Sequence, residues 1–243
     1  MNSLDIQKAL LGNQKMKNKF LLALTLGVAT CGVMAQSKFD GAYGQVGIGY
    51  EGITPSISNS SVVVTDNVGP SQQPVGLSAN NSNSFTGLIS AGYMKSVNQS
   101  FLLGFGVDFS PIKGRNTSYS VSSGPVAVVG NYNKEYYYNI FISPAAPIGS
   151  EGLIYGKFGY TGAMIKDVIA GSSSNTNFSG LSLGLGYKQI IEGGLYGFVE
   201  GTYLLYGNQY FSNSGVINGY TVTSSYTTRA DAYNLLLGVG YKF

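Results

Sequence analysis

The stretch Tyr233-Asn234-Leu235-Leu236-Leu237-Gly238-Val239-Gly240-Tyr241-Lys242-Phe243 decides how this chain folds. Every second residue carries a large apolar side chain, as in a β-strand, whose successive side chains point to opposite faces. The positions between them are Asn234, Leu236, Gly238, Gly240 and Lys242. This second face is too small and polar to build the core of a soluble protein, so the apolar face is expected to contact lipid.

Large apolar residues alternate with glycine in four segments. These are 46–50, 103–107, 183–187 and 237–241. A phosphate-binding turn would also need a third glycine at a fixed spacing and a following helix, and the sequence offers neither. Glycine weakens an ordinary strand, so its repeated use on one face indicates a crowded place, such as the interior of a narrow barrel.

Large apolar residues at every second position mark further strands along the whole chain. Together they predict an all-β fold, an eight-stranded antiparallel transmembrane β-barrel. Most candidate strands have about ten to thirteen residues, enough for a tilted strand to cross a membrane. The strands are about 40–51, 84–95, 99–109, 134–143, 152–162, 178–190, 194–206 and 232–243.

The connections alternate between long and short. The long ones, 52–83, 110–133, 163–177 and 207–231, are rich in Ser, Asn, Thr and Gly. The short ones are 96–98, 144–151 and 191–193. Long extracellular loops and short periplasmic turns are typical of an outer-membrane barrel of a Gram-negative bacterium. We expect the long loops to be flexible and, because the strand number is even, both termini to lie on the periplasmic side.

Strand parity assigns the side chains to two faces. The lipid-facing candidates are Val46, Ile48, Tyr50, Phe101, Leu103, Phe105, Val107, Phe109, Tyr136, Tyr138, Ile140, Ile142, Leu181, Leu183, Leu185 and Tyr187. The inward candidates are Gln45, Ser90, Asp108, Asn139, Lys157, Ser182, Lys188, Glu200 and Thr202. Nearly all charge within the strands faces inward, which fits an outer face in hydrocarbon.

Many of the 19 tyrosines lie near strand ends, where a membrane protein places an aromatic girdle. The candidates are Tyr43, Tyr50, Tyr93, Tyr160, Tyr187, Tyr206, Tyr233 and Tyr241. A soluble lipocalin-like barrel is the rival fold, but it would bury its large apolar face and cover its outside with charge. Only 10% of this chain is charged, which favours the membrane barrel.

Residues 1–35 are expected to be a leader and cleavable signal peptide, followed by one barrel domain at 36–243. Two lysines precede an apolar run at 20–29, and Val33-Met34-Ala35 supplies small residues for cleavage after Ala35. Met16 is the expected functional start, although the sequence leaves Met1 open. Cleavage would remove Cys31, the one cysteine of the chain; the alternative is that Cys31 is a lipidation site.

Charge and composition restrict the chemistry. The chain has 14 basic and 11 acidic residues, of which the leader holds four lysines and one acid. The remaining chain therefore has ten of each and no excess of positive charge that would bind nucleic acid. Histidine is absent, which removes the central group of serine-His hydrolysis and of imidazole metal sites. We therefore expect no enzyme, no catalytic residue, no cofactor and no metal.

The chain resembles the OmpA/OmpX-type family of small outer-membrane β-barrel proteins. The resemblance rests on the signal sequence, the eight alternating strands, the alternation of long loops with short turns, and the ending Tyr241-Lys242-Phe243. The resemblance covers 36–243. It implies that the barrel-assembly machinery reads the terminal strand. The residues of this assembly signal would be Tyr233, Leu235, Leu237, Val239, Tyr241 and Phe243.

Four inward residues suggest a charge network in the lumen: Lys157, Lys188, Glu200 and Asp108. Its role could be structural, because a charge in a narrow interior needs a partner. It could instead be a gate or a selectivity element of a small pore.

The sequence favours a structural or surface-interaction role, of the adhesion type, through the long loops. The alternative is a porin-like small-solute pore, since an interior lined by glycine leaves room for water. Expected partners are membrane lipid, lipopolysaccharide through Lys113 and Arg115, the assembly machinery, and a surface ligand at the loops. The physiological ligand or solute and the oligomeric state have no signature in the sequence.

Overall fold

The computed structural model describes residues 37–65, 69–73, 75–123, 126–169, 171–217 and 220–243. The expected signal peptide and its cleavage point lie outside these residues. The barrel domain forms one compact unit, 36–243. Among the described residues, none belongs to a helix of the length and apolarity that a membrane crossing requires.

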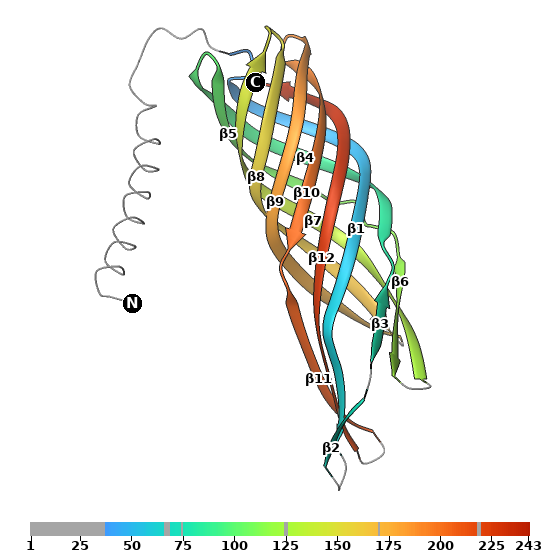
Figure 1. Cartoon of the computed structure of the whole chain (residues 1–243). Helices are drawn as coiled ribbons and strands as arrows, with labels where there is room; N and C mark the ends of the chain where they lie inside the picture. The colour runs from blue at the N-terminus through green and yellow to red at the C-terminus, as the bar shows by residue number, and fades with distance from the viewer. Residues whose placement is uncertain (1–36, 66–68, 74, 124–125, 170, 218–219) are drawn as a thin grey trace, which may run out of the picture. The chain divides into compact units, whose positions relative to one another are not determined.

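Eight strands of the described chain form a closed antiparallel ring, as the sequence predicts (Figure 1). In order around the ring they are β1 (Gly41–Thr65), β4 (Ser82–Asn98), β5 (Phe101–Ser110), β7 (Val126–Ile148), β8 (Gly152–Ile169), β9 (Ser172–Glu192), β10 (Leu195–Tyr206) and β12 (Tyr220–Lys242). Strand β12 returns to pair with β1, so this part of the sheet has no open edge.

The seam between β1 and β12 has the register expected from the sequence. Gly47 lies opposite Gly238, and Tyr50 lies opposite Leu235. At the end of the seam, the amide of Phe243 donates a hydrogen bond to the carbonyl of Ala42 over 2.9 Å. Both ends of the barrel domain therefore lie at the end of the barrel that carries the short turns.

The described residues of the four long connections are largely β-strand and not irregular loop, whereas their flexibility stays a prediction. Strands β1, β7, β8, β9 and β12 continue into them, and four further strands pair there: β2 (Pro70–Gln73), β3 (Gly76–Ala79), β6 (Thr117–Ser123) and β11 (Gln209–Ile217). Figure 1 shows these paired extensions projecting from the end of the barrel opposite the short turns. The short turns are tighter than expected, because β7 reaches Ile148 and leaves only three residues before β8.

Polar residues form these extensions because the backbone ladder does not need an apolar face. Strand β1 pairs with β12 as far as Thr65 opposite Thr221, and the hydroxyl groups of Ser61 and Ser225 lie 3.0 Å apart across the two strands. Such cross-strand hydroxyl pairs stabilise a sheet. The ladder therefore persists where the alternation of apolar residues has ended.

The outer face of the ring carries an apolar band. Of the lipid-facing candidates, all but Tyr136 and Tyr187 are largely exposed, and these two are half-buried. The exposed fraction reaches 63% at Phe105 and 64% at Leu181. Soluble monomers rarely expose an apolar surface this extensive, so the band is the surface that contacts hydrocarbon.

Two tyrosines do not belong to the predicted aromatic girdle. Tyr43 and Tyr206 are 5% and 6% exposed, because each shares the parity of the inward residues of its strand. Tyr50, Tyr93, Tyr160, Tyr233 and Tyr241 are exposed, as a girdle requires.

The inner face contains large rings as well as small residues. The ring of Phe198 lies over the paired glycines of the seam: a methyl group at Gly47 or Gly238 would lie 2.9 Å or 2.7 Å from its edge. Tyr196 and Tyr155 lie in the same way over Gly240 and Gly186. These four glycines therefore seat aromatic rings, which fill part of the space that a pore would need.

The crowding predicts a stability loss at Gly106, where an added methyl group would lie 2.6 Å from the Phe141 ring and 2.8 Å from the carbonyl of Ala91. Gly106→Ala should destabilise the barrel by about 1–3 kcal/mol through overpacking, measured by denaturant unfolding in lipid vesicles. Gly197→Ala is the control, because its nearest neighbour would lie 3.8 Å away. Equal stability of the two variants would contradict tight packing at Gly106.

Candidate functional site

All nine side chains predicted to face inward are buried, and three of them form an ion triad at the middle of the barrel. Lys157 on β8 donates to Asp108 on β5, with Nζ 3.0 Å from Oδ2 and 3.2 Å from Oδ1. It also donates to Glu200 on β10, with Nζ 2.8 Å from Oε2 and 2.9 Å from Oε1. One ammonium group thus joins two carboxylates from opposite parts of the ring.

Neighbouring groups satisfy the remaining hydrogen-bonding capacity of the triad. The hydroxyl of Tyr155 donates to Glu200 over 2.7 Å, and the hydroxyl of Thr202 donates to it over 3.2 Å. The side-chain amide of Asn139 donates to Asp108 over 3.2 Å. The Phe141 ring closes one side, its centroid 4.2 Å from the ammonium of Lys157. The triad and this ring therefore lie together inside the ring of strands.

Lys188 lies apart from the triad, although the sequence grouped the four charges. Its ammonium group lies 3.8 Å from the ring centroid of Tyr43, 4.8 Å from that of Tyr196 and 5.2 Å from that of Tyr155. Among the described residues it forms no ion pair within 4.0 Å. Cation–π attraction to these rings compensates part of its desolvation. With Lys188 counted, the four residues comprise two basic and two acidic side chains.

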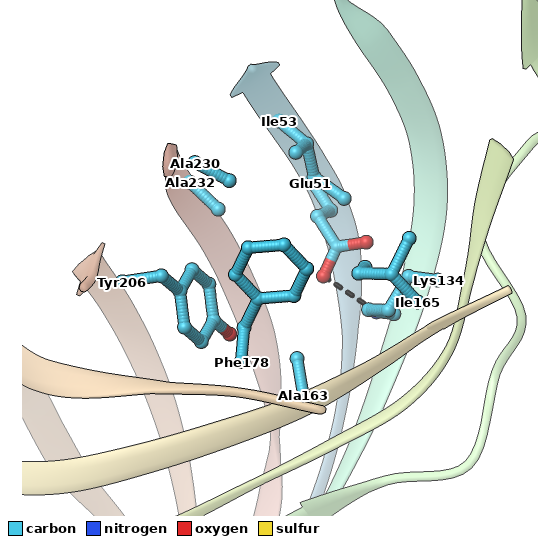
Figure 2. Close-up of a pocket in the computed structure, with 9 residues that line it drawn as sticks. All are labelled: Glu51, Ile53, Lys134, Ala163, Ile165, Phe178, Tyr206, Ala230 and Ala232. Carbon is cyan, nitrogen blue, oxygen red and sulfur yellow. Dashed lines mark hydrogen bonds and ion pairs between the residues drawn. The ribbon is translucent and has the colours of Figure 1, made fainter. Parts of the chain in front are cut away.

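A second buried ion pair, which the sequence analysis missed, lies nearer the long extensions. Lys134 Nζ donates to Glu51 Oε2 over 2.5 Å, and both side chains are almost fully buried. Figure 2 shows the pair at one side of a small pocket, with the side chains of Phe178 and Tyr206 across from it. When the Asn234 amide is oriented to suit its neighbours, it donates to Glu51 and accepts from Tyr137.

Parity could have found Glu51, which follows Gln45 at an even spacing on the same strand. It could not have found Lys134. The pairing of β7 with β8 shifts register between Lys134 and Tyr136, a β-bulge that turns Lys134 inward, out of step with Asn139. A bulge leaves no clear signal in the sequence, which therefore predicts Lys134 only as the first residue of a strand.

Two further sets of predicted residues have defined positions. The six apolar residues of the proposed assembly signal all face outward on β12 and the chain end, and their recognition by other proteins stays a prediction. Lys113 forms an ion pair with Glu135 over 2.5 Å. The hydrogen bond from Lys113 holds the pKa of the Glu135 carboxyl below its usual value. This pairing reduces the positive charge available to a lipopolysaccharide phosphate.

Comparison with solved structures places the fold among outer-membrane barrels. The chain is similar to the outer membrane protein OprG from Pseudomonas aeruginosa, with 13% identity and a TM-score of 0.53 over 85% of this chain and 98% of that chain. A weaker match is the outer membrane protease OmpT from Escherichia coli, with 13% identity and a TM-score of 0.47 over 88% of this chain and 100% of that chain. Another is Neisserial surface protein A, with 17% identity and a TM-score of 0.40 over 86% of this chain and 99% of that chain. No protein-family model and no curated protein matches the sequence.

These likenesses do not single out the OmpA/OmpX-type family. The likeness to OprG agrees in fold with the closed ring, and the apolar outer band of the ring is the surface that contacts the membrane. The chain is an eight-stranded β-barrel of the bacterial outer membrane.

Proposed function

We propose that the protein is a surface-interaction barrel, in which the membrane-spanning ring anchors a β-structured extracellular extension that contacts a partner. The observation that carries this proposal is the ion triad of Lys157, Asp108 and Glu200, which supports a closed lumen. Lipopolysaccharide around the barrel and the assembly machinery during insertion are partners of the same proposal.

The extension offers a surface suited to contact. Strands β11, β12, β1 and β2 lie side by side there in one sheet, and β3, β6 and β7 pair in another part of the extension. Because the backbone is already ordered by these ladders, binding a partner would cost less conformational entropy than ordering flexible loops. An adhesion-type contact fits this ordered, largely uncharged surface.

The β11–β12 hairpin can be shortened to test the proposal. Its register pairs Gln209 with Thr228, so a tight turn replacing 210–227 keeps the ring and removes the hairpin. Surface binding of expressing cells to immobilised extracellular matrix should fall to the level of cells without the protein. The same shortening of the β6–β7 hairpin, replacing 118–131 between the paired Thr117 and Tyr132, shows whether the contact is specific to one hairpin.

Planar-bilayer recording separates this proposal from a small-solute pore. The refolded protein should show no reproducible open steps, because the triad and the Phe141 ring occupy the lumen. Reproducible steps would overturn the closed lumen. Matrix binding that survives both shortened hairpins would overturn the contact through the extension.

A further inference from the structure

The β-structured extension contains a large cavity whose wall is mostly apolar. Its volume is about 700 Å³, within the roughly 300–1,000 Å³ range of small-molecule sites. Strands β1, β3, β6, β8 and β9 contribute apolar side chains, among them Ile57, Leu77, Val121, Ile169 and Phe178. Such a wall suits an aliphatic ligand.

The wall also carries polar side chains, and several of these are engaged with other protein groups. Burial raises the pKa of the Tyr132 hydroxyl to about 12, and this hydroxyl donates to the carbonyl of Asn80 over 2.6 Å. Arg229 is bound by Asp231, with Nη2 3.1 Å from Oδ1. The other charged residue of the wall, Asp167, forms a hydrogen bond with Tyr119. Both charged residues of the wall are thus engaged with protein groups, and apolar side chains supply most of its exposed surface.

The cavity lies next to the small pocket of Figure 2. The two share four lining residues: Ile53, Ile165, Phe178 and Ala230. The small pocket has a volume of about 10 Å³, roughly that of one water-sized sphere. It is too small for a chain but large enough for a single hydroxyl group.

The Glu51 carboxylate lines this pocket with one oxygen unused. Oε2 accepts from Lys134, whereas Oε1 is buried and accepts no hydrogen bond from any described residue. A buried acceptor without a donor costs free energy, so it favours a ligand that brings one. The structure therefore places a hydrogen-bond acceptor at the small pocket beside the apolar cavity.

The Glu51–Lys134 ion pair favours a ligand whose hydrogen-bond donor is uncharged. Because Glu51 and Lys134 neutralise each other, the pocket has no net charge to attract an ion. A carboxylate would face the Glu51 oxygen with no proton to donate, and an ammonium group would lie close to Lys134. A neutral hydroxyl meets neither repulsion.

We propose that this cavity is a binding site for an uncharged aliphatic molecule with a terminal hydroxyl group. The chain packs against the cavity wall, and the hydroxyl enters the small pocket and donates to Glu51 Oε1. This inference is independent of the proposed contact through the outer surface of the extension.

Methyl NMR of protein labelled at isoleucine Cδ1, in phospholipid nanodiscs, tests the site with 1-decanol as the probe. The methyl groups of Ile53 and Ile165, which line the small pocket, should shift in a saturable way. Ile140 and Ile142 face lipid and report partitioning into the bilayer. Decane should bind roughly ten- to a hundredfold more weakly, the factor expected for a lost hydrogen bond to a charged group, and decanoate should leave Ile53 unshifted.

Two variants separate the acceptor from the wall. Glu51→Leu/Lys134→Met removes the acceptor without leaving a lone buried charge, and should make decanol and decane bind alike. Ile57→Lys should abolish binding of both probes, while Ser56→Lys, exposed at the next position, should change neither. A gel shift between boiled and unboiled samples verifies folding of each variant. Equal binding of decanol and decane by the unaltered protein, or unshifted Ile53 and Ile165 methyl groups, would overturn the proposal.

Discussion

Replacement of Lys157 by methionine is expected to destabilise the folded barrel by about 3–5 kcal/mol. The variant leaves the carboxylates of Asp108 and Glu200 buried and facing each other without the ammonium group that bridges them. Guanidinium unfolding of protein inserted in lipid vesicles, followed by far-UV circular dichroism, measures the loss. Lys38→Met is the matched control, because Lys38 forms an exposed pair with Glu151 and such pairs contribute about 0–1 kcal/mol.

A double-mutant cycle decides whether the triad acts as a unit. Glu200→Ala alone leaves Lys157 with Asp108 as its partner, so we expect it to cost less than Lys157→Met. Glu200→Ala combined with Lys157→Ala should differ from the sum of the single changes by about 0.5–3 kcal/mol, since contacting residues couple. Additive losses would refute the coupling.

Leu237→Lys is expected to destabilise insertion by about 2–4 kcal/mol, because it places a charge on the lipid face near the middle of the membrane. Leu237 on β12 is 61% exposed and lies between Ile48 and Val199, which are exposed as well. Unfolding in vesicles and heat-modifiability on a gel measure the effect.

The matched control for this change is Leu195→Lys. Leu195 lies on the same outer face, 40% exposed, but directly after the short turn that precedes β10. A charge near the interface should cost only about 0–1 kcal/mol. Equal costs at the two positions would contradict the placement of the membrane along the strands.

The ring was predictable because hydrocarbon imposes a simple rule on alternate residues. In segments such as 103–109 and 181–187 every outward position is apolar, so period and parity give the strand and its faces together. The rule ends with the membrane. Beyond it, 56–61 on β1 is Ser-Ile-Ser-Asn-Ser-Ser, which reads as loop although its backbone pairs with β12.

The interior was only partly predictable, because its contacts cross the barrel. Parity placed Lys157, Asp108 and Glu200 inside, but the height at which they meet depends on the stagger of the strands, which the sequence does not state. The position of the Phe198 ring over Gly47 and Gly238 also depends on this stagger, because the three residues lie on three different strands. Lys134 faces the lumen only because of a β-bulge, which the sequence does not reveal. Lys188 contacts aromatic rings, although the sequence suggests a carboxylate partner.

The seam between β1 and β12 has a consequence for how the barrel forms. It joins residues almost a full barrel domain apart in sequence, from Tyr43 opposite Lys242 to Thr65 opposite Thr221. Pairings of such high contact order are slow, because the entropy of closing a long loop is lost before the ladder compensates for it. Until β12 is made and delivered, β1 keeps a bare edge beside an apolar face, a combination prone to aggregation. The chain is therefore most prone to aggregate in the interval before the seam forms.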